Sequence, residues 1–73
     1  MKKGTIDRLM RDRGFGFIRG EGGDSIFFHR SALPAGEFDR LEPGDRVEFE
    51  ETMGDKGLKA TRVRLVSRAG VSP

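Results

Sequence analysis

The sequence predicts an all-β protein, a small closed barrel of five antiparallel strands. Short runs in which apolar and charged residues alternate predict strands with one buried face. Eleven glycines interrupt the 73 residues too often for long helices, and no stretch has the apolar spacing of a helix over three turns. Five short strands in one small domain favour a barrel, because closure removes the exposed edges of a sheet.

Three strands are predicted in the first half of the chain. They cover residues 5–10, 15–19 and 25–29. The intervening segments, Arg-Asp-Arg-Gly at 11–14 and Gly-Glu-Gly-Gly-Asp at 20–24, have the composition of tight turns. We therefore expect three consecutive strands joined by short turns.

The second half begins with the longest connection and ends with two strands. Residues 30–45 contain two prolines and two glycines, with one helical turn expected at 31–33. Residues 46–50 and 61–65 then alternate between apolar and charged side chains, as half-buried antiparallel strands do. Residues 53–57 between them have the composition of a loop.

The alternation also predicts the core and the limits of the domain. We expect residues 1–66 to form the domain and residues 67–73 to be a flexible C-terminal tail. The core is expected to contain nine apolar residues: Ile6, Ile18, Ile26, Phe28, Leu33, Val47, Phe49, Val63 and Leu65.

Composition excludes several classes of function. The chain has no Cys and one His, so disulfides, thiol nucleophiles and a structural zinc site are not expected. We expect no catalytic residue, metal, cofactor or small-molecule substrate, and therefore no enzyme. The longest apolar run is three residues, far below the roughly 18–20 of a membrane span. In the absence of a charged-then-apolar leader we expect a cytoplasmic protein, and we expect a monomer.

Charge is unevenly distributed along the chain. Residues 1–30 carry seven Lys or Arg and four acids, residues 37–55 two Arg and eight acids, and residues 56–73 five Lys or Arg and no acid. If the two basic ends meet in the fold, they form a basic face with an acidic back, which suits nucleic acid. Arg outnumbers Lys by ten to four; this suits phosphate binding, although a GC-rich genome would produce the same bias.

The second predicted strand carries the clearest candidate site. A period of two places two Phe between two Arg on one face, and Gly, Gly and Ile on the other. The first set is Arg13, Phe15, Phe17 and Arg19. Either the two rings belong to the core, or they face outward and stack on bases while the cations hold phosphates. The flanking Arg, and the need for glycine where the strands of a small barrel bend sharply, favour the second interpretation.

The third predicted strand repeats this pattern. Phe27 and Phe28 point to opposite faces, so one ring must be exposed. Phe27, which shares its face with His29, is the better candidate. If these two side chains lie beside Phe15 and Phe17, they form one exposed aromatic patch, and such a patch usually marks a binding site.

These residues resemble those of a known family. Residues 2 to about 66 look like a bacterial cold-shock domain, an OB-fold barrel that binds single-stranded RNA and DNA. Residues 13–18 match the family's first RNA-binding motif, Lys-Gly-(Phe/Tyr)-Gly-Phe-Ile, and residues 26–29 resemble its second, Val-Phe-Val-His-Phe. Residues 41–49 and 54–57 resemble its Leu-x-x-Gly-x-x-Val-x-Phe segment and its Gly-x-(Lys/Arg)-Gly loop. The resemblance implies base stacking on five rings and backbone contacts by two cations: Phe15, Phe17, Phe27, His29 and Phe38, with Arg13 and Lys56.

Two positions depart from the family where it has rings. Arg8 stands in place of a Trp, and Arg30 in place of the last Phe of the second motif. A guanidinium can stack on a base and can also pair with phosphate. We therefore expect Arg8 and Arg30 near phosphates or bases, and binding that is more electrostatic in character.

The expected function is binding of single-stranded RNA or DNA, as an RNA chaperone or a cold-shock-type regulator of transcription or translation. The alternative is an OB-fold adaptor that uses the same aromatic patch to dock a partner protein. Strong salt dependence would favour nucleic acid, and binding that persists at high salt would favour a protein partner.

Overall fold

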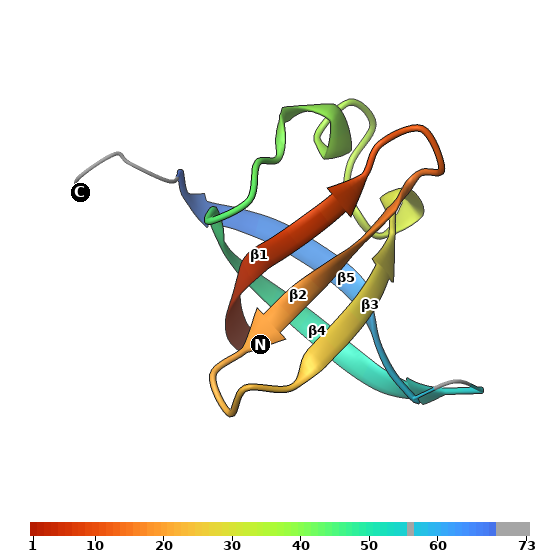
Figure 1. The fold of residues 1–73 in the computed structure, drawn as a ribbon, viewed down its shortest axis with the longest axis vertical. Helices are drawn as coiled ribbons and strands as arrows, with labels where there is room; N and C mark the ends of the chain where they lie inside the picture. Colours follow the sequence, from red (N-terminus) through yellow and green to blue (C-terminus); the bar gives the residue numbers. More distant parts are fainter. Residues whose placement is uncertain (56, 69–73) are drawn as a thin grey trace.

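The computed structural model describes residues 1–55 and 57–68, and in this part of the chain five strands alternate with turns and two short 3-10 helices (Figure 1). The elements in chain order are β1 (Lys2–Met10), β2 (Phe15–Gly20), β3 (Ser25–His29), η1 (Arg30–Ala32), η2 (Phe38–Arg40), β4 (Arg46–Gly54) and β5 (Gly57–Ser67). Among these residues, no helix is long and apolar enough to cross a membrane.

The strands close into a barrel in the order β1-β2-β3-β5-β4, which confirms the predicted five-stranded barrel. Neighbouring strands are antiparallel except at one seam, where β3 and β5 run parallel and Phe27 lies opposite Lys59. The expectation of a purely antiparallel barrel is wrong at this seam. The reason is topological, since strand direction must alternate around an antiparallel ring and a ring of five cannot alternate all the way round.

β3 has the predicted bounds, whereas β2 is one residue longer than predicted and β1, β4 and β5 are also longer. β1 begins at Lys2 because its first residues pair with β4. β4 and β5 continue into a hairpin in which Gly54 pairs with Gly57, so most of the predicted loop at 53–57 is strand. Side chains in this hairpin, such as Met53, are exposed, so the alternation in polarity ends before the strands do.

The predicted core is confirmed for eight of its nine residues. The ninth, Leu65, is partly buried and packs against the core from β5. Three apolar residues outside the predicted set are also buried: Phe38, Leu41 and Ala60. Ala60 lies opposite Phe28 at the parallel seam, where a small side chain leaves room for the ring.

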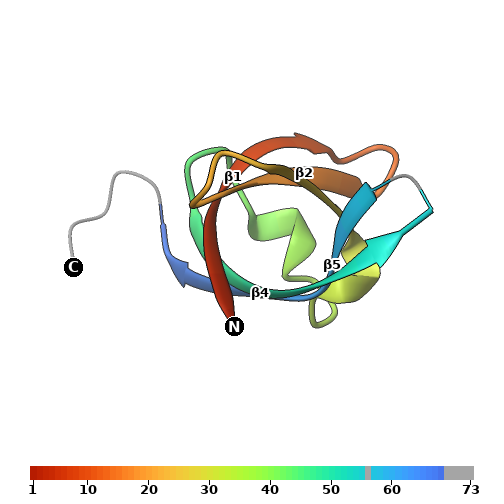
Figure 2. The same ribbon diagram turned by 90° about the horizontal axis from the view of Figure 1, so that it is seen from below.

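The long connection between β3 and β4 closes one end of the barrel, as the view along the barrel shows (Figure 2). η2 places the Phe38 ring against Phe28, with centroids 6.0 Å apart, and Leu41 is fully buried. The connection is fastened to β1 by backbone hydrogen bonds, including one of 2.8 Å from the Ile6 N–H to the Asp45 carbonyl. The connection therefore belongs to the hydrophobic core.

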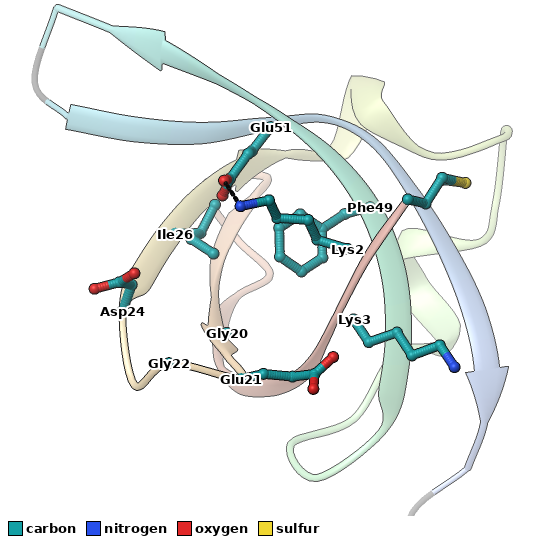
Figure 3. Close-up of a pocket in the computed structure, with 10 residues that line it drawn as sticks. Lys2, Lys3, Gly20, Glu21, Gly22, Asp24, Ile26, Phe49 and Glu51 are labelled. Atoms are coloured by element: carbon teal, nitrogen blue, oxygen red, sulfur yellow. Dashed lines mark ion pairs between the residues drawn. The ribbon is translucent and has the colours of Figure 1, made fainter.

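At the other end of the barrel an ion pair joins β1 to β4 (Figure 3). Lys2 Nζ lies 2.7 Å from Glu51 Oε1, and this hydrogen bond raises the pKa of the Lys2 ammonium above its usual value. The pair lies over a hollow of about 340 Å³ that Phe49 and Ile26 help to line. Exposed ion pairs contribute little to stability, and none of the sequence-predicted site residues that the structure describes lines this hollow.

Gly16 shows how closely the inner face of β2 is packed. A Cβ at this position would lie 2.9 Å from the Arg8 carbonyl oxygen and 2.9 Å from the Phe28 ring. These distances are shorter than van der Waals contact, and the carbonyl belongs to backbone that cannot move without disturbing the β1–β2 ladder. The absence of a side chain at Gly16 therefore lets β1, β2 and the Phe28 ring approach one another.

We expect Gly16→Ala to lower the free energy of unfolding by about 1–3 kcal/mol, the usual cost of overpacking a core. Urea denaturation followed by far-ultraviolet circular dichroism measures this change. Gly22→Ala is the matched control, because the nearest atom to its Cβ would be 3.8 Å away. Equal stability of the two variants would contradict the close packing described for Gly16.

Candidate nucleic-acid interface

On β2, Phe15 and Phe17 face outward, as the second interpretation of the sequence predicts. Ile18 is fully buried and Gly16 is buried beside it, whereas Phe15 and Phe17 are only half-buried. The alternative, in which both rings belong to the core, is therefore wrong. The inner face of β2 has no room for them, because the Phe28 ring already occupies the space over Gly16.

The faces of β3 are divided in the same way. Phe28 is completely buried, whereas Phe27 is 36% exposed and His29 is exposed. In the β2–β3 register Phe17 lies opposite Phe27, and Phe15 lies opposite His29. The two strands therefore bring the four predicted aromatic side chains to one outer face of the barrel.

Three of these side chains form a ring cluster, which we call the aromatic cluster: Phe15, Phe17 and Phe27. The Phe15 ring centroid lies 6.0 Å from that of Phe17 and 5.5 Å from that of Phe27, and the last two are 5.9 Å apart. Two of the three contacts are edge-to-face, a favourable arrangement for aromatic pairs. Mutual contact explains why the rings are half-buried although they lie outside the core.

Arg8 extends this surface onto β1. Its Cζ lies 5.1 Å from the Phe17 ring centroid, within the range of a cation–π contact. Strict alternation from the buried Ile6 would turn Arg8 inward, but the β1–β2 register shifts between these two residues. This irregularity leaves both Asp7 and Arg8 exposed, and so it sets the guanidinium on the aromatic cluster.

His29 and Arg30 lie at the end of β3 and beginning of η1. The His29 Nδ1 accepts a 3.1 Å hydrogen bond from the Ser31 backbone N–H and lies 2.9 Å from Ser31 Oγ. This cap fixes the direction of the imidazole. The Arg30 side chain crosses over Gly14, where a Cβ would lie 3.2 Å from Arg30 Cδ. Gly14 has a φ of +77°, a conformation that glycine adopts readily.

A hollow of about 450 Å³ lies beside the aromatic cluster. Phe17 and Phe27 form one wall, and the β4–β5 hairpin supplies Leu58 and Lys59 on the other. Sequence reasoning missed Leu58 and Lys59. Their only signal was indirect, since the parallel pairing that sets Lys59 beside Phe27 cannot be deduced from the pattern of either strand. The predicted cation Lys56 lies outside the described residues.

Phe38 corrects the sequence-based expectation of an exposed stacking ring. It is 4% exposed, and its ring packs against Phe28 inside the barrel. The connection that carries Phe38 closes the end of the barrel and needs an apolar side chain on its inner side. In this structure Phe38 therefore presents no face to a base.

The acidic side chains of β4 lie beside cations of the neighbouring strands, and this differs from the expected basic face with an acidic back. The ion pairs are Glu48–Arg64, Glu50–Arg62 and Glu51–Lys2. The hydrogen bond from Arg64 also lowers the pKa of Glu48 below its usual value. Because β4 pairs directly with β5 and β1, the three Glu of β4 are each paired with a cation of a neighbouring strand.

The cations around the aromatic cluster have a different environment. Within residues 1–55 and 57–68, no ion pair is formed by Arg8, Arg13 or Arg30. In the same part of the chain no three His, Asp or Glu side chains gather as metal ligands would. The site therefore offers flat rings and unpaired guanidiniums, the combination that suits bases joined by phosphates.

Known proteins are similar to this chain in sequence and in structure. A family model described as "'Cold-shock' DNA-binding domain" matches residues 2–66. "Cold shock protein 2" of Lactiplantibacillus plantarum is 44% identical over 64 residues, which are 88% of this chain and 97% of the relative. "Cold shock protein CspA" of Staphylococcus aureus is 43% identical over 63 residues, or 86% and 96% of the two chains. The solved structure "drosophila Unr CSD456" superposes with a TM-score of 0.73 at 29% identity; the match covers 97% of this chain and 29% of that one.

The different burial of two rings leads to a prediction about stability. We expect Phe38→Ala to lower the free energy of unfolding by about 3–5 kcal/mol, as truncation of a core Phe does. Phe27→Ala should cost clearly less, because part of this ring is already in water. Thermal and urea denaturation of both variants measure the difference. A larger loss for Phe27→Ala would reverse the assignment of core and surface rings.

Proposed function

The chain belongs to the family of cold-shock DNA-binding domains, and from this premise we propose that it binds single-stranded RNA or DNA by stacking bases on the aromatic cluster. The observation that carries the proposal is the group of three mutually contacting rings on the outer face of β2 and β3. Any base can stack on such rings, because every base has a flat π face. A preference for single strands follows, since bases in a duplex already stack on one another.

His29 and the hollow beside Phe17 and Phe27 extend the stacking surface in two directions. The imidazole is held in place by Ser31, so it can offer a flat face at little cost in side-chain entropy. The hollow has apolar walls from Leu58 and the two rings, with Asp55 also among its lining residues, and we propose that it receives the edge of a base. Lys59 at its rim can hold the adjoining phosphate.

Arg8, Arg13 and Arg30 supply the electrostatic part of the binding. Arg8 lies over Phe17, where a base can stack on the guanidinium plane or a phosphate can accept its hydrogen bonds. Arg13 and Arg30 stand beyond the Phe15 end of the cluster and suit the continuing backbone. By analogy with its family, Lys56 is proposed as a further backbone contact.

Holding single strands in this way would oppose the formation of RNA secondary structure. We therefore propose the role of an RNA chaperone or of a cold-shock-type regulator of transcription or translation, performed by binding alone. Bases released from the cluster would pair again, so the effect on RNA structure would depend on protein concentration.

We expect Phe15→Ala and Phe27→Ala each to weaken binding of a short oligothymidine by about 5- to 150-fold, which corresponds to about 1–3 kcal/mol per stacked base. Fluorescence anisotropy of a labelled oligonucleotide measures the affinity, because the chain has no Trp to report binding. The control is Pro34→Ala, which truncates an exposed apolar residue in the connection between β3 and β4. Unchanged affinity in both Phe variants, with the fold intact by circular dichroism, would refute the stacking site.

A second prediction concerns salt. The slope of log affinity against log salt should become shallower by about 0.7 in Arg8→Gln, because one phosphate contact of a single strand is lost. The same titration separates the two classes of partner. Binding of a partner protein that is unaffected by salt and by competing oligonucleotide would support the alternative, an adaptor that docks a protein on the same cluster.

A further inference from the structure

A second group of cations lies on the outer face of the barrel, next to the aromatic cluster. Arg19 on β2 and Arg46 on β4 flank Thr5 on β1, and the register aligns all three, since Thr5 lies opposite Arg19 on one side and opposite Arg46 on the other. On β5, Ser67 lies opposite Arg46. We call Arg19, Thr5, Arg46 and Ser67 the cationic row.

The row has the spacing and chemistry of a backbone contact. Neighbouring strands are about 4.8 Å apart, so the Cα atoms of Arg19 and Arg46 are about 10 Å apart, and both side chains are exposed. In the register Thr5 stands between Arg19 and Arg46, and Ser67 extends the row beyond Arg46. Guanidiniums and hydroxyls are common donors to phosphate oxygens.

The surroundings of the row are also predominantly cationic. Together with Lys3, its residues line a groove of about 570 Å³ that contains one carboxylate, that of Glu21. Glu48, which lies opposite Lys3, is already bonded to Arg64. Asp7 is the acid nearest Arg19, with 3.7 Å between the carboxylate and the guanidinium.

The row is continuous with the aromatic cluster. On β2, Arg19 follows Phe17 on the same outer face, one period of the strand away. A strand stacked on Phe17 can therefore leave the cluster over Arg19 and cross β1 toward Arg46. The four residues of the row are charged or hydroxylated, and the exposed apolar side chain of Val66 lies beside them in the same groove.

We propose that nucleic acid longer than the aromatic cluster continues over the cationic row, where Arg19 and Arg46 hold its phosphates without reading its bases. This inference rests on the proposed function, since it extends the path of the same strand. It assigns a role to Arg46, which lies in the most acidic part of the sequence and belongs to no nucleic-acid motif. Asp7 then limits the affinity of the row, because it competes with phosphate for Arg19.

The test uses the full chain and two labelled oligothymidines of about 4 and about 12 nucleotides, which lie within the range of lengths bound by one OB fold. Affinities of the wild type and of Arg46→Gln are measured by anisotropy between about 50 and about 200 mM salt. Arg40→Gln is the matched control, since it removes one exposed Arg in η2 at the same cost in net charge.

For the longer oligonucleotide we expect Arg46→Gln to bind several-fold more weakly and with a salt slope shallower by about 0.7. Its affinity for the shorter one should equal that of the Arg40→Gln control. Asp7→Asn should strengthen binding of the longer oligonucleotide alone, because it frees Arg19 for phosphate.

If Arg46→Gln and Arg40→Gln lose the same affinity for both oligonucleotides, the proposal is overturned, because the loss would then reflect only the change in net charge. Unchanged affinity of Arg46→Gln for the longer oligonucleotide would also overturn the proposal. The proposed function would still hold in that case, provided that the protein binds the shorter oligonucleotide. Failure of the wild type to bind either length would refute the proposed function itself.

Discussion

The structure depends on the small interior of its five-stranded barrel. Phe28 and Phe49 are both fully buried within it, and at Gly16 the barrel has no room even for a methyl group. Since successive residues of a strand point to opposite sides, each inward residue forces its neighbours outward. Phe28 on the inside therefore requires Phe27 on the outside, and Gly16 inside requires Phe15 and Phe17 outside. The aromatic cluster is a consequence of this packing.

Pairing between strands arranges the charges in a similar way. β4 carries Glu48, Glu50 and Glu51, and each has a cation of β5 or β1 beside it. β2 and β3 lie on the far side of the ring from β4, so the guanidiniums around the aromatic cluster are not neutralised by this acidic segment. A sequence with a formal net charge of only +2 thus presents a locally cationic surface. Strand order, more than total charge, decides where a polyanion can bind.

The sequence was sufficient to predict the barrel and most of its core, because alternation is a local property. Alternation left two orientations of β2 open, and the flanking Arg and the glycines favoured the one that the structure has. It was insufficient where the answer depended on long-range pairing. Lys59 is beside Phe27 only through the parallel seam. The family resemblance placed Arg8 at the binding surface, but the shift in the β1–β2 register that turns it outward could not be deduced from the pattern. Phe38 lies in a connection without periodicity, so the family resemblance alone implied an exposed ring, and closure of the barrel end instead requires a buried one.

The replacement of rings by guanidiniums changes how much of the proposed binding comes from stacking and how much from charge. An aromatic platform contributes through contact with a base and is insensitive to salt, whereas an Arg such as Arg8 contributes through both stacking and charge. Arg8 retains contact with the platform, since it lies over Phe17. The cationic row shifts the balance further in the same direction, because it adds phosphate contacts without a ring. Affinity should therefore grow with the length of the strand, while discrimination among bases stays confined to the few nucleotides on the aromatic cluster.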